Sequence, residues 1–331
     1  MEGEEEGGKQ CFVRFYDIAA DMNKGGMERG KKGTLKKVGR RMIKEYYMED
    51  MHTVQYPFLP SSASSCSLSQ FYEMGLFVVV DGHGGRDAAM AAADLFPAVA
   101  QEILEKVEGE GEEGEGLLAM DALFEEVERR LKCESDSGQS SKGFSANQFD
   151  CEGCTATAVF IYQNKKSGKR YLQVANVGDS TAFLCRKEKS IPLSVDHSAA
   201  HPEEIERLKN DFGVIVEEGN KRLPGVELAV SRALGDFFAK SEEVKSGLIA
   251  IPYVHPVVEI VENDAFVIVA SDGLWDIYTG QEVADMTLEK MKTRPQKMNV
   301  EEEDNIARML ITKAMQADHC HDNITAILVG L

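Results

Sequence analysis

One stretch, LFVVVDGHGG at residues 76–85, constrains the fold of this chain more than any other. Its five apolar residues run without a break into Asp81, and a short run rich in β-branched residues is typical of a buried strand. The glycines that follow allow a sharp turn and a close approach of a ligand to the backbone. The stretch therefore indicates either a metal or catalytic site at a strand end, or a tight turn in which Asp81 caps backbone N–H groups.

Three further apolar runs carry an aspartate at one end. Residues 265–271 run into Asp272, residues 171–177 run into Gly178 and Asp179, and Asp322 precedes residues 324–329. Four such runs favour carboxylates that converge at one edge of a sheet system. Carboxylate and carbonyl oxygens are the ligands that suit Mg²⁺ and Mn²⁺.

The composition limits the class of protein. With 331 residues and 43% hydrophobic content, the chain can form one large domain or two ordinary ones. A formal net charge of −19 disfavours a nucleic-acid binder. Seven cysteines, an odd number, do not indicate a disulfide framework, and we find no signal peptide and no run of transmembrane length. We expect a monomeric intracellular protein, in the cytoplasm or the nucleus, that binds neither nucleic acid nor membrane.

The N-terminal part differs from the rest of the chain. Residues 1–40 are polar and glycine-rich, and residues 31–41 contain a cluster of Lys and Arg. We expect a solvated arm over residues 1–40, although the basic cluster also fits an import signal or a docking patch. Residues 41–331 then form one domain.

The periodicity of the remaining chain predicts an α+β fold. Apolar residues at helical spacing predict helices over residues 86–107, 117–132, 202–210, 281–292 and 302–317, the first of which ends or bends at Pro97. Two strands, 155–162 and 171–177, flank a turn and form a hairpin. Hairpins rather than strict strand–helix alternation favour antiparallel sheets with helices packed outside them.

The chain also contains a CxxC sequence, Cys151 to Cys154. A structural zinc site needs two more ligands, usually a second close pair. His319, Cys320 and His321 are candidates, but nothing in the sequence brings them near. The simpler interpretation is that Cys154 is a small buried residue at the start of a strand.

Taken together, the motifs resemble those of the type 2C, metal-dependent protein serine/threonine phosphatases. The resemblance spans roughly residues 40–331 in collinear order. It rests on MED at 48–50, VVVDGHGG at 78–85, GCTATAVF at 153–160, VANVGDS at 174–180, DH at 196–197, LAVSRALGD at 228–236, VASDGLWD at 269–276 and DNITAILV at 322–329. It implies two central antiparallel β-sheets that form a sandwich flanked by helices, with a two-metal site at one end and a phosphoprotein as substrate.

The resemblance also implies roles for individual residues. Asp81 should bridge two Mg²⁺ or Mn²⁺ ions, and His83 should act as general acid. The remaining metal ligands are the Gly82 carbonyl and the carboxylates of Asp272 and Asp322, with Glu49 and Asp50 acting through bound waters, and with Asp179 and Asp276 beside Asp272 at a weaker third ion. Two such ions lower the pKa of a bridging water and neutralise phosphate charge. The resulting hydroxide would attack phosphorus in line.

The chain departs from the family at residues that contact phosphate. Many members have an arginine where this chain has Glu45, and the chain also differs at Cys154, Thr181 and Ser198. This leaves a second hypothesis beside the enzyme, a weakly active or inactive relative that acts by binding partners. A generic two-metal nuclease is disfavoured by the acidic composition. The segment 198–225, here called the flap, matches a variable region of the family and is expected to set the choice of substrate.

Overall fold

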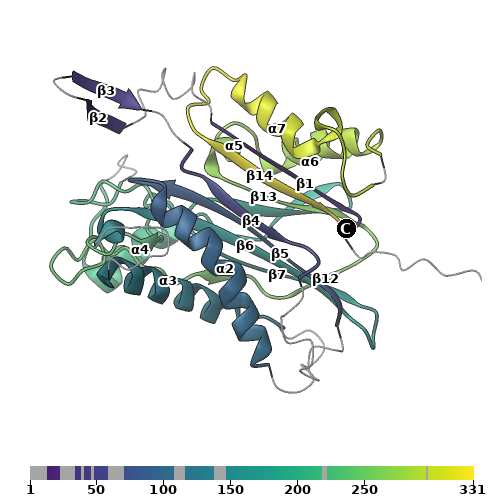
Figure 1. Ribbon diagram of the computed structural model, residues 1–331, viewed down its shortest axis with the longest axis horizontal. Coiled ribbons are helices and arrows are strands. Elements are labelled where there is room, and N and C mark those ends of the chain that lie inside the picture. The colour runs from purple at the N-terminus through teal and green to yellow at the C-terminus, as the bar shows by residue number, and fades with distance from the viewer. Residues whose placement is uncertain are drawn as a thin grey trace, which may run out of the picture.

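The computed structural model of the protein describes residues 13–22, 34–38, 41–45, 48–58, 71–107, 116–137, 147–217, 222–295 and 297–331. Two β-sheets pack face to face, and helices cover both outer faces (Figure 1). This is the predicted α+β sandwich. In the described part of the chain, no helix combines the length and the apolar character needed to cross a membrane.

The two sheets are antiparallel. The five-stranded sheet has the order β1 (Phe15–Asp21), β14 (Ile324–Gly330), β13 (Asp264–Ala270), β8 (Thr181–Arg186) and β9 (Lys189–Pro192). The seven-stranded sheet has the order β11 (Tyr253–Val254), β7 (Arg170–Val177), β6 (Gly153–Asn164), β5 (Phe71–His83) and β4 (Met51–Gln55), with β10 (Leu234–Gly235) on β6 and β12 (Val258–Ile260) on β7. A separate hairpin consists of β2 (Thr34–Val38) and β3 (Arg41–Glu45).

Alternation along β5 explains its unbroken apolar run. Phe77 and Val79 face the other sheet and join the hydrophobic cluster between the two sheets. Leu76, Val78 and Val80 face outward and pack in the cluster under α2 and α3. Because successive side chains of a strand point to opposite faces, a strand that is covered on both faces must be apolar at every position.

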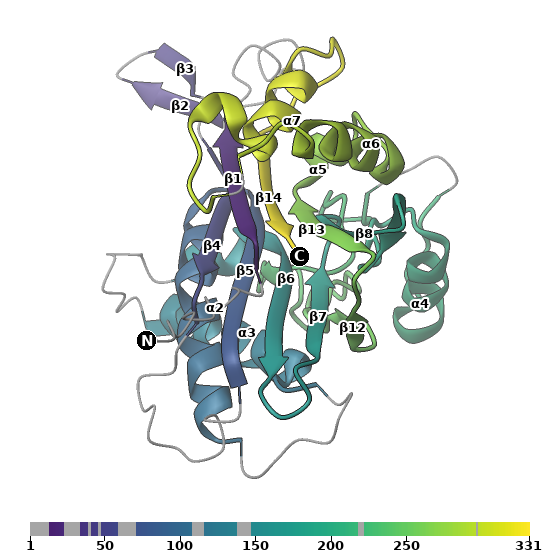
Figure 2. The ribbon, with the colours of Figure 1, turned by 90° about the vertical axis from the view of Figure 1, so that its right-hand side faces the viewer.

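The helices form the outer layers of the sandwich. Helices α2 (Asp87–Glu105) and α3 (Met120–Ser137) cover the seven-stranded sheet, and α6 (Gly280–Met291) and α7 (Ile306–Met315) cover the five-stranded sheet. Shorter elements are α4 (Pro202–Phe212), α5 (Asp272–Trp275), and the 3₁₀ turns η2 (Gln148–Asp150) and η3 (Glu302–Asp304). In Figure 2, α4 lies apart from these layers, and residues around it form a small hydrophobic cluster of their own.

One of the sequence-based expectations is wrong. Phe15–Asp21 lies in the expected polar arm, but it forms β1 and pairs with β14 along its whole length (Figure 2). Its buried residues alternate, which is the pattern of a half-buried strand. The sequence predicted a helix that ends or bends at Pro97, and the structure excludes the first alternative, because α2 continues through Pro97. The basic cluster at residues 31–41 lies partly in the β2–β3 hairpin and partly outside the described residues.

A buried ion pair fixes β1 to the helical layer. The side chains of Asp17 and Arg294 are each at most 2% exposed, and Arg294 Nη2 donates to Asp17 Oδ1 at 2.6 Å. Asp17 also accepts a hydrogen bond from the backbone N–H of Ile306 at the start of α7. The Arg294 guanidinium stacks on the ring of Phe15 at 3.7 Å. Strand β1, the start of α7 and the turn that follows α6 thus meet at this pair.

We predict that Asp17→Ala lowers the free energy of unfolding by ~3–5 kcal/mol, because it leaves the Arg294 charge buried without its partner. Asp21→Ala is the matched control on the same strand, since Asp21 pairs with Arg308 through a side chain that is 45% exposed, and it should cost at most ~1 kcal/mol. Urea unfolding of both variants measures the difference. Equal losses would contradict the assigned role of the buried pair.

Candidate active site

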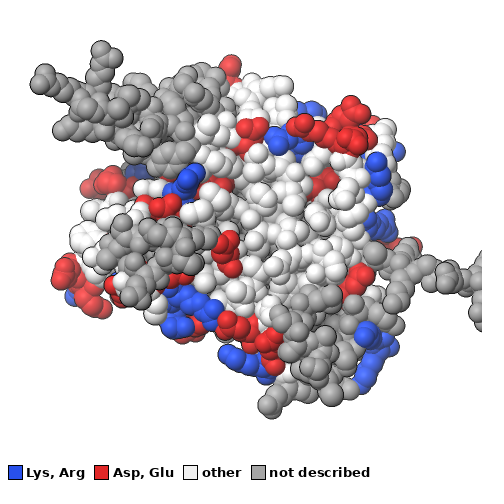
Figure 3. All heavy atoms as spheres, in the orientation of Figure 1, with Lys and Arg blue, Asp and Glu red and all other residues white. Residues whose placement is uncertain are grey.

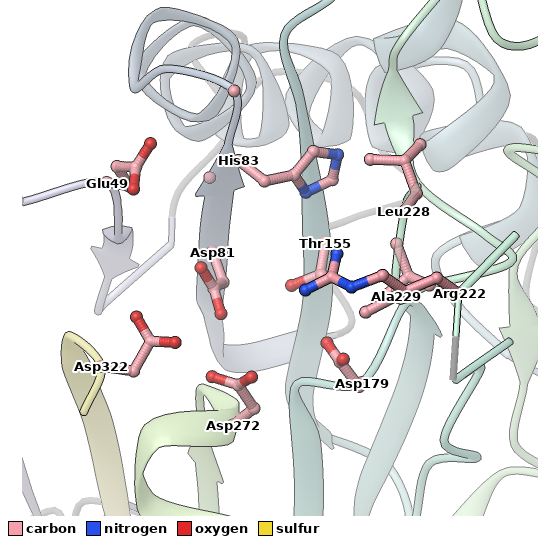
Figure 4. Close-up of a pocket in the computed structure, with 13 residues that line it drawn as sticks. Glu49, Asp81, His83, Thr155, Asp179, Arg222, Leu228, Ala229, Asp272 and Asp322 are labelled. Atoms are coloured by element: carbon pink, nitrogen blue, oxygen red, sulfur yellow. The ribbon is translucent and has the colours of Figure 1, made fainter. Parts of the chain in front are cut away.

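A cavity of about 400 Å³ opens at one end of the gap between the two sheets. Acidic side chains from both sheets surround it, as Figure 4 shows. Its lining consists of Glu49, Asp81, Gly82, His83, Gly84, Thr155, Asp179, Arg222, Leu228, Ala229, Val230, Asp272 and Asp322. The four aspartates that follow or precede apolar runs in the sequence therefore do converge.

Strand geometry places Asp81 and His83 in the same cavity. β5 does not end at Asp81, as the sequence suggested, but continues through Gly82 to His83, and these residues pair with Thr155, Cys154 and Gly153 of β6. Residues two apart share a face of the strand, so Asp81 and His83 lie on the face that Phe77 and Val79 present to the other sheet. A Cβ on Gly82 would lie 2.7 Å from the Glu49 carbonyl oxygen, so only glycine fits there.

The five-stranded sheet supplies the opposing acids. Asp272 begins α5 directly after β13, and Asp322 lies two residues before β14. Between them and the other sheet lies Asp50, which is 3% exposed and accepts a hydrogen bond from Ser271 Oγ at 2.8 Å. Ser271 Oγ in turn accepts from the Thr325 N–H at 3.0 Å. This chain of contacts holds the start of β4 against the ends of β13 and β14.

The carboxylates are crowded in a poorly solvated place. Burial, followed by the charges of Asp50, Asp272 and Asp179, raises the pKa of Asp81 well above its ordinary range. Burial and the charge of Asp272 raise the pKa of Asp179 to about 8. For Asp50, burial is again the largest cause and brings the pKa to about 6, although its hydroxyl hydrogen bonds oppose the shift. Such a cluster favours whatever positive charge can enter it, whether protons or cations.

The donor atoms fit a hard divalent cation. Carboxylates and a backbone carbonyl suit Mg²⁺ and Mn²⁺, whereas zinc prefers sulfur and nitrogen. Among the described residues, no three His, Cys, Asp or Glu side chains already converge as a ligand set for one ion. Ions held here would therefore share the carboxylates with water and the Gly82 carbonyl. Among the described residues, the same finding gives no zinc cluster at the CxxC sequence. Cys151 is exposed, and Cys154 is buried in β6.

The wall facing the acids carries a cation. Arg222, in the flap, extends over Thr155 toward the carboxylates in Figure 4, and its Nη1 donates to the Glu227 carbonyl at 2.5 Å. The neighbouring lining residues 228–230 are followed by Ser231 and Arg232, which bind the buried Glu204 of α4 at 2.5 and 2.6 Å. Although burial opposes it, hydrogen bonds from Arg232, Arg207 and Ser231 lower the pKa of Glu204 to about 2. Glu204 thus ties this wall to α4.

Most of the candidate site residues lie where the sequence suggested. Asp81, Gly82, His83, Asp179, Asp272, Asp322 and Glu49 line the cavity, and Asp50 lies just behind it. Asp276 is exposed at the end of α5 and is not a lining residue. Glu45 ends β3, and its side chain lies outside the described residues. Sequence reasoning missed Arg222 and Asp236. The signal it used was an aspartate at the end of a long apolar run, and neither residue stands at the end of such a run.

The structure is thus a two-sheet sandwich with an acidic cavity to which both sheets contribute residues. The sequence model of the protein phosphatase 2C family matches residues 45–324. The chain belongs to this family, in which metal dependence is general. The structure agrees, since the crystal structure of serine-threonine phosphatase 2C from Toxoplasma gondii superposes with a TM-score of 0.66 at 21% identity, over 95% of this chain and 94% of that one.

Named relatives give the same family. A probable protein phosphatase of Dictyostelium discoideum is 35% identical over 330 residues, which cover 96% of this chain and 30% of the relative. Probable protein phosphatase 2C 45 of Oryza sativa subsp. japonica is 31% identical over 83% of this chain and 86% of its own length. The chain thus spans about a third of the Dictyostelium relative.

We predict that the metal-free protein loses stability as pH rises. The pKa of Asp179 is raised in the folded state, from 3.8 to about 8, so the folded state holds a proton that the unfolded chain releases near pH 4. Stability from this group is complete below pH ~4 and is lost as pH approaches 8. In EDTA, the Tm of wild type should fall between pH 5 and pH 8, and Asp179→Asn should flatten that fall.

The exposed Asp318→Asn is the matched control and should follow wild type. Melting curves of the three proteins across this pH range decide the prediction. Parallel pH dependence in all three would show that Asp179 does not carry the effect.

Proposed function

We propose that this chain is a metal-dependent protein phosphatase that hydrolyses phosphoserine and phosphothreonine in proteins. The single observation that carries the proposal is the meeting of acids from both sheets with Arg222 in one cavity. Carboxylates alone would repel a phosphate monoester, and a cation alone would bind it without activating water. Family membership supports the hydrolase class.

We assign the metal ligands as the sequence suggested. Asp81, the Gly82 carbonyl, Asp272 and Asp322 would hold two Mg²⁺ or Mn²⁺ ions, with Glu49 and Asp50 acting through water. Asp179 and Asp276, with Asp272, would hold a weaker third ion. Bound divalent ions would acidify a water and offset the phosphate charge. The crowding that raises the pKa values of Asp81, Asp50 and Asp179 supports this assignment.

His83 is placed to protonate the departing serine or threonine oxygen. Its side chain is 25% exposed in the cavity, and its Nε2 lies 2.6 Å from Asp236 Oδ2. Burial alone would lower its pKa, but the charge and hydrogen bond of Asp236 outweigh burial and raise it. A raised pKa keeps the imidazolium available as a proton donor near neutral pH. Asp81 lies on the same strand face and, as a metal ligand, would help to place the water that attacks phosphorus.

Arg222 takes the role that Glu45 cannot fill. A guanidinium can make two charge-assisted hydrogen bonds to a phosphate dianion, whereas an ionised glutamate offers no donor. Its position opposite the carboxylates supports an enzyme over the alternative, a relative that only binds partners. Turnover of a phosphothreonine peptide with and without Mn²⁺ separates the two. Metal-stimulated release of phosphate supports the enzyme, and a folded protein without turnover supports the partner-binding alternative.

We predict that Asp81→Asn and Asp272→Asn each weaken Mn²⁺ binding and abolish turnover, while the fold is retained. Each substitution removes negative charge from the place where cations gather. Asp121→Asn, an exposed residue of α3, is the control and should behave as wild type in both assays. Titration calorimetry and phosphate release measure the effects. Unchanged Mn²⁺ binding in both site variants would defeat the assignment of these ligands.

We predict that Arg222→Ala raises KM for a phosphopeptide by about ten- to hundredfold, the range expected when one charge-assisted contact is lost. The kcat should change little if the contact is equally strong in the ground and transition states. Arg207→Ala, which instead removes a partner of Glu204 at the flap's base, is a stability control. Steady-state kinetics at saturating Mn²⁺ test the assignment, and an unaltered KM in Arg222→Ala refutes it.

A further inference from the structure

The motif LAVSRALGD at residues 228–236 ends in Asp236, which meets His83 across the sheet. Asp236 is 3% exposed, and its Oδ2 lies 2.6 Å from His83 Nε2. Because that ring nitrogen is engaged away from the cavity, only Nδ1 remains to face a substrate. In Figure 4 the His83 ring has one nitrogen directed toward the middle of the cavity and one directed away from it.

The backbone around Asp236 is held in an unusual conformation. Asp236 has φ +50°, directly after Gly235 at φ +75°. A non-glycine residue in this region stores strain, which persists only where neighbouring contacts fix it. Here the Asp236 N–H donates to the Glu152 carbonyl at 2.9 Å, and the Asp236 carbonyl accepts from the Lys240 N–H at 3.2 Å. Two contacts thus clamp the residue that reaches His83.

A second carboxylate supports this turn from α3. Glu128 Oε2 accepts from the Gly235 N–H at 2.9 Å, and Glu128 Oε1 binds Lys240 Nζ at 2.6 Å. The side chain of Glu128 is 18% exposed and that of Lys240 is 14% exposed. The outer helix α3 therefore fixes the turn that carries Asp236, although α3 itself contributes no residue to the cavity lining.

Gly153 leaves the space in which the pair forms. It pairs with His83 on one side of β6 and with Gly235 on the other. A Cβ at this position would overlap the Asp236 carboxylate and would lie 2.8 Å from His83 Nε2. The backbone of Gly153 is an ordinary strand backbone, so its lack of a side chain serves the pair rather than a turn.

We infer that Asp236 is a positioning residue for the phosphatase reaction. It accepts the Nε2–H of the His83 imidazolium, which orients the ring so that Nδ1–H faces the leaving oxygen and fixes the Nε2–H tautomer of the neutral ring. The inference rests on the proposed function, but the placement of the ring also has a readout that needs no turnover. In the step, the bond between phosphorus and the serine or threonine oxygen breaks, that oxygen takes the proton from Nδ1–H of the imidazolium, and the neutral ring keeps Nε2–H on Asp236.

Kinetics with two kinds of substrate test the inference. An aryl phosphate has a leaving group that needs little protonation, whereas a phosphothreonine peptide depends on the acid. Asp236→Asn should slow the peptide on the order of 10²-fold, within the ~10²–10⁴-fold range of general acid catalysis, and should slow the aryl phosphate far less. Combining it with His83→Gln should cost no more than His83→Gln alone, since one residue acts through the other.

Gly153→Ala provides an independent variant, because it displaces the pair and changes neither titratable group. It should show the same dependence on the leaving group. Asp264→Asn is the matched control, since Asp264 is a buried aspartate paired with Arg186 at 2.7 Å at the far end of β13. It should lower stability and leave the ratio of the two rates unchanged. Equal losses on both substrates, or additive losses in the double variant, would overturn the inference.

The ring nitrogens give the second readout. In ¹⁵N spectra of histidine-labelled protein, the His83 signals are assigned from their absence in His83→Gln. Wild type should show a proton on Nε2 and Asp236→Asn should lose that preference, whether or not the protein turns over phosphopeptide. If turnover is absent but the tautomer responds, the proposed function fails and the positioning survives. An unchanged tautomer in Asp236→Asn would overturn the positioning role itself.

Discussion

The repulsion between carboxylates at the mouth of the sandwich is the constraint on which the rest of the structure depends. Burial raises the pKa of Asp81 and Asp179, and the neighbouring charge of Asp272 raises both further. A cluster of this kind would spread apart unless rigid elements held it. Each acid accordingly stands at or near the end of a buried strand, and the interlayer hydrophobic cluster behind them fixes the distance between the sheets.

Glu204, a buried carboxylate outside the cavity, shows the opposite solution. Glu204 is 2% exposed, yet Arg207, Arg232 and Ser231 surround it with donors, so its pKa falls to about 2. A buried charge that two guanidinium groups pair makes a rigid joint, whereas the crowding of acids at the cavity raises the pKa of Asp81, Asp50 and Asp179. The contrast separates an acid that holds the fold together from acids that serve a site.

Local pattern was enough to predict antiparallel sheets with outer helices and the convergence of four aspartates, and the resemblance to the phosphatase family supplied the two-sheet sandwich and the other site residues. The unbroken apolar run before Asp81 requires cover on both faces, and the sandwich supplies that cover. Pattern failed where the decisive contact is distant in sequence. Nothing near Asp17 shows that Arg294, 277 residues away, will bury its charge. The predicted helix end at Pro97 is absent because a helix that packs against a sheet can keep a proline that an isolated helix would not tolerate.

The missed site residues have a similar cause. Arg222 and Asp236 lie in irregular segments, where side-chain direction follows from turns rather than from a period of two or 3.6 residues. A signal did exist for Asp236, because glycine before an acid suggests a left-handed turn. That signal gives no partner, and only the fold places His83, 153 residues earlier in the chain, beside it.

Because the acids come from different sheets, cation binding and sheet packing are coupled. Asp81 belongs to the seven-stranded sheet, whereas Asp272 and Asp322 belong to the ends of the five-stranded one. The Ser271–Asp50 hydrogen bond is the direct link that already joins the two sides at this point. A ligand that binds only the folded arrangement adds RT ln(1 + [L]/Kd) to stability. Cations that offset the repulsion would therefore also strengthen the seam between the sheets, so occupancy of the site and rigidity of the cavity rise together.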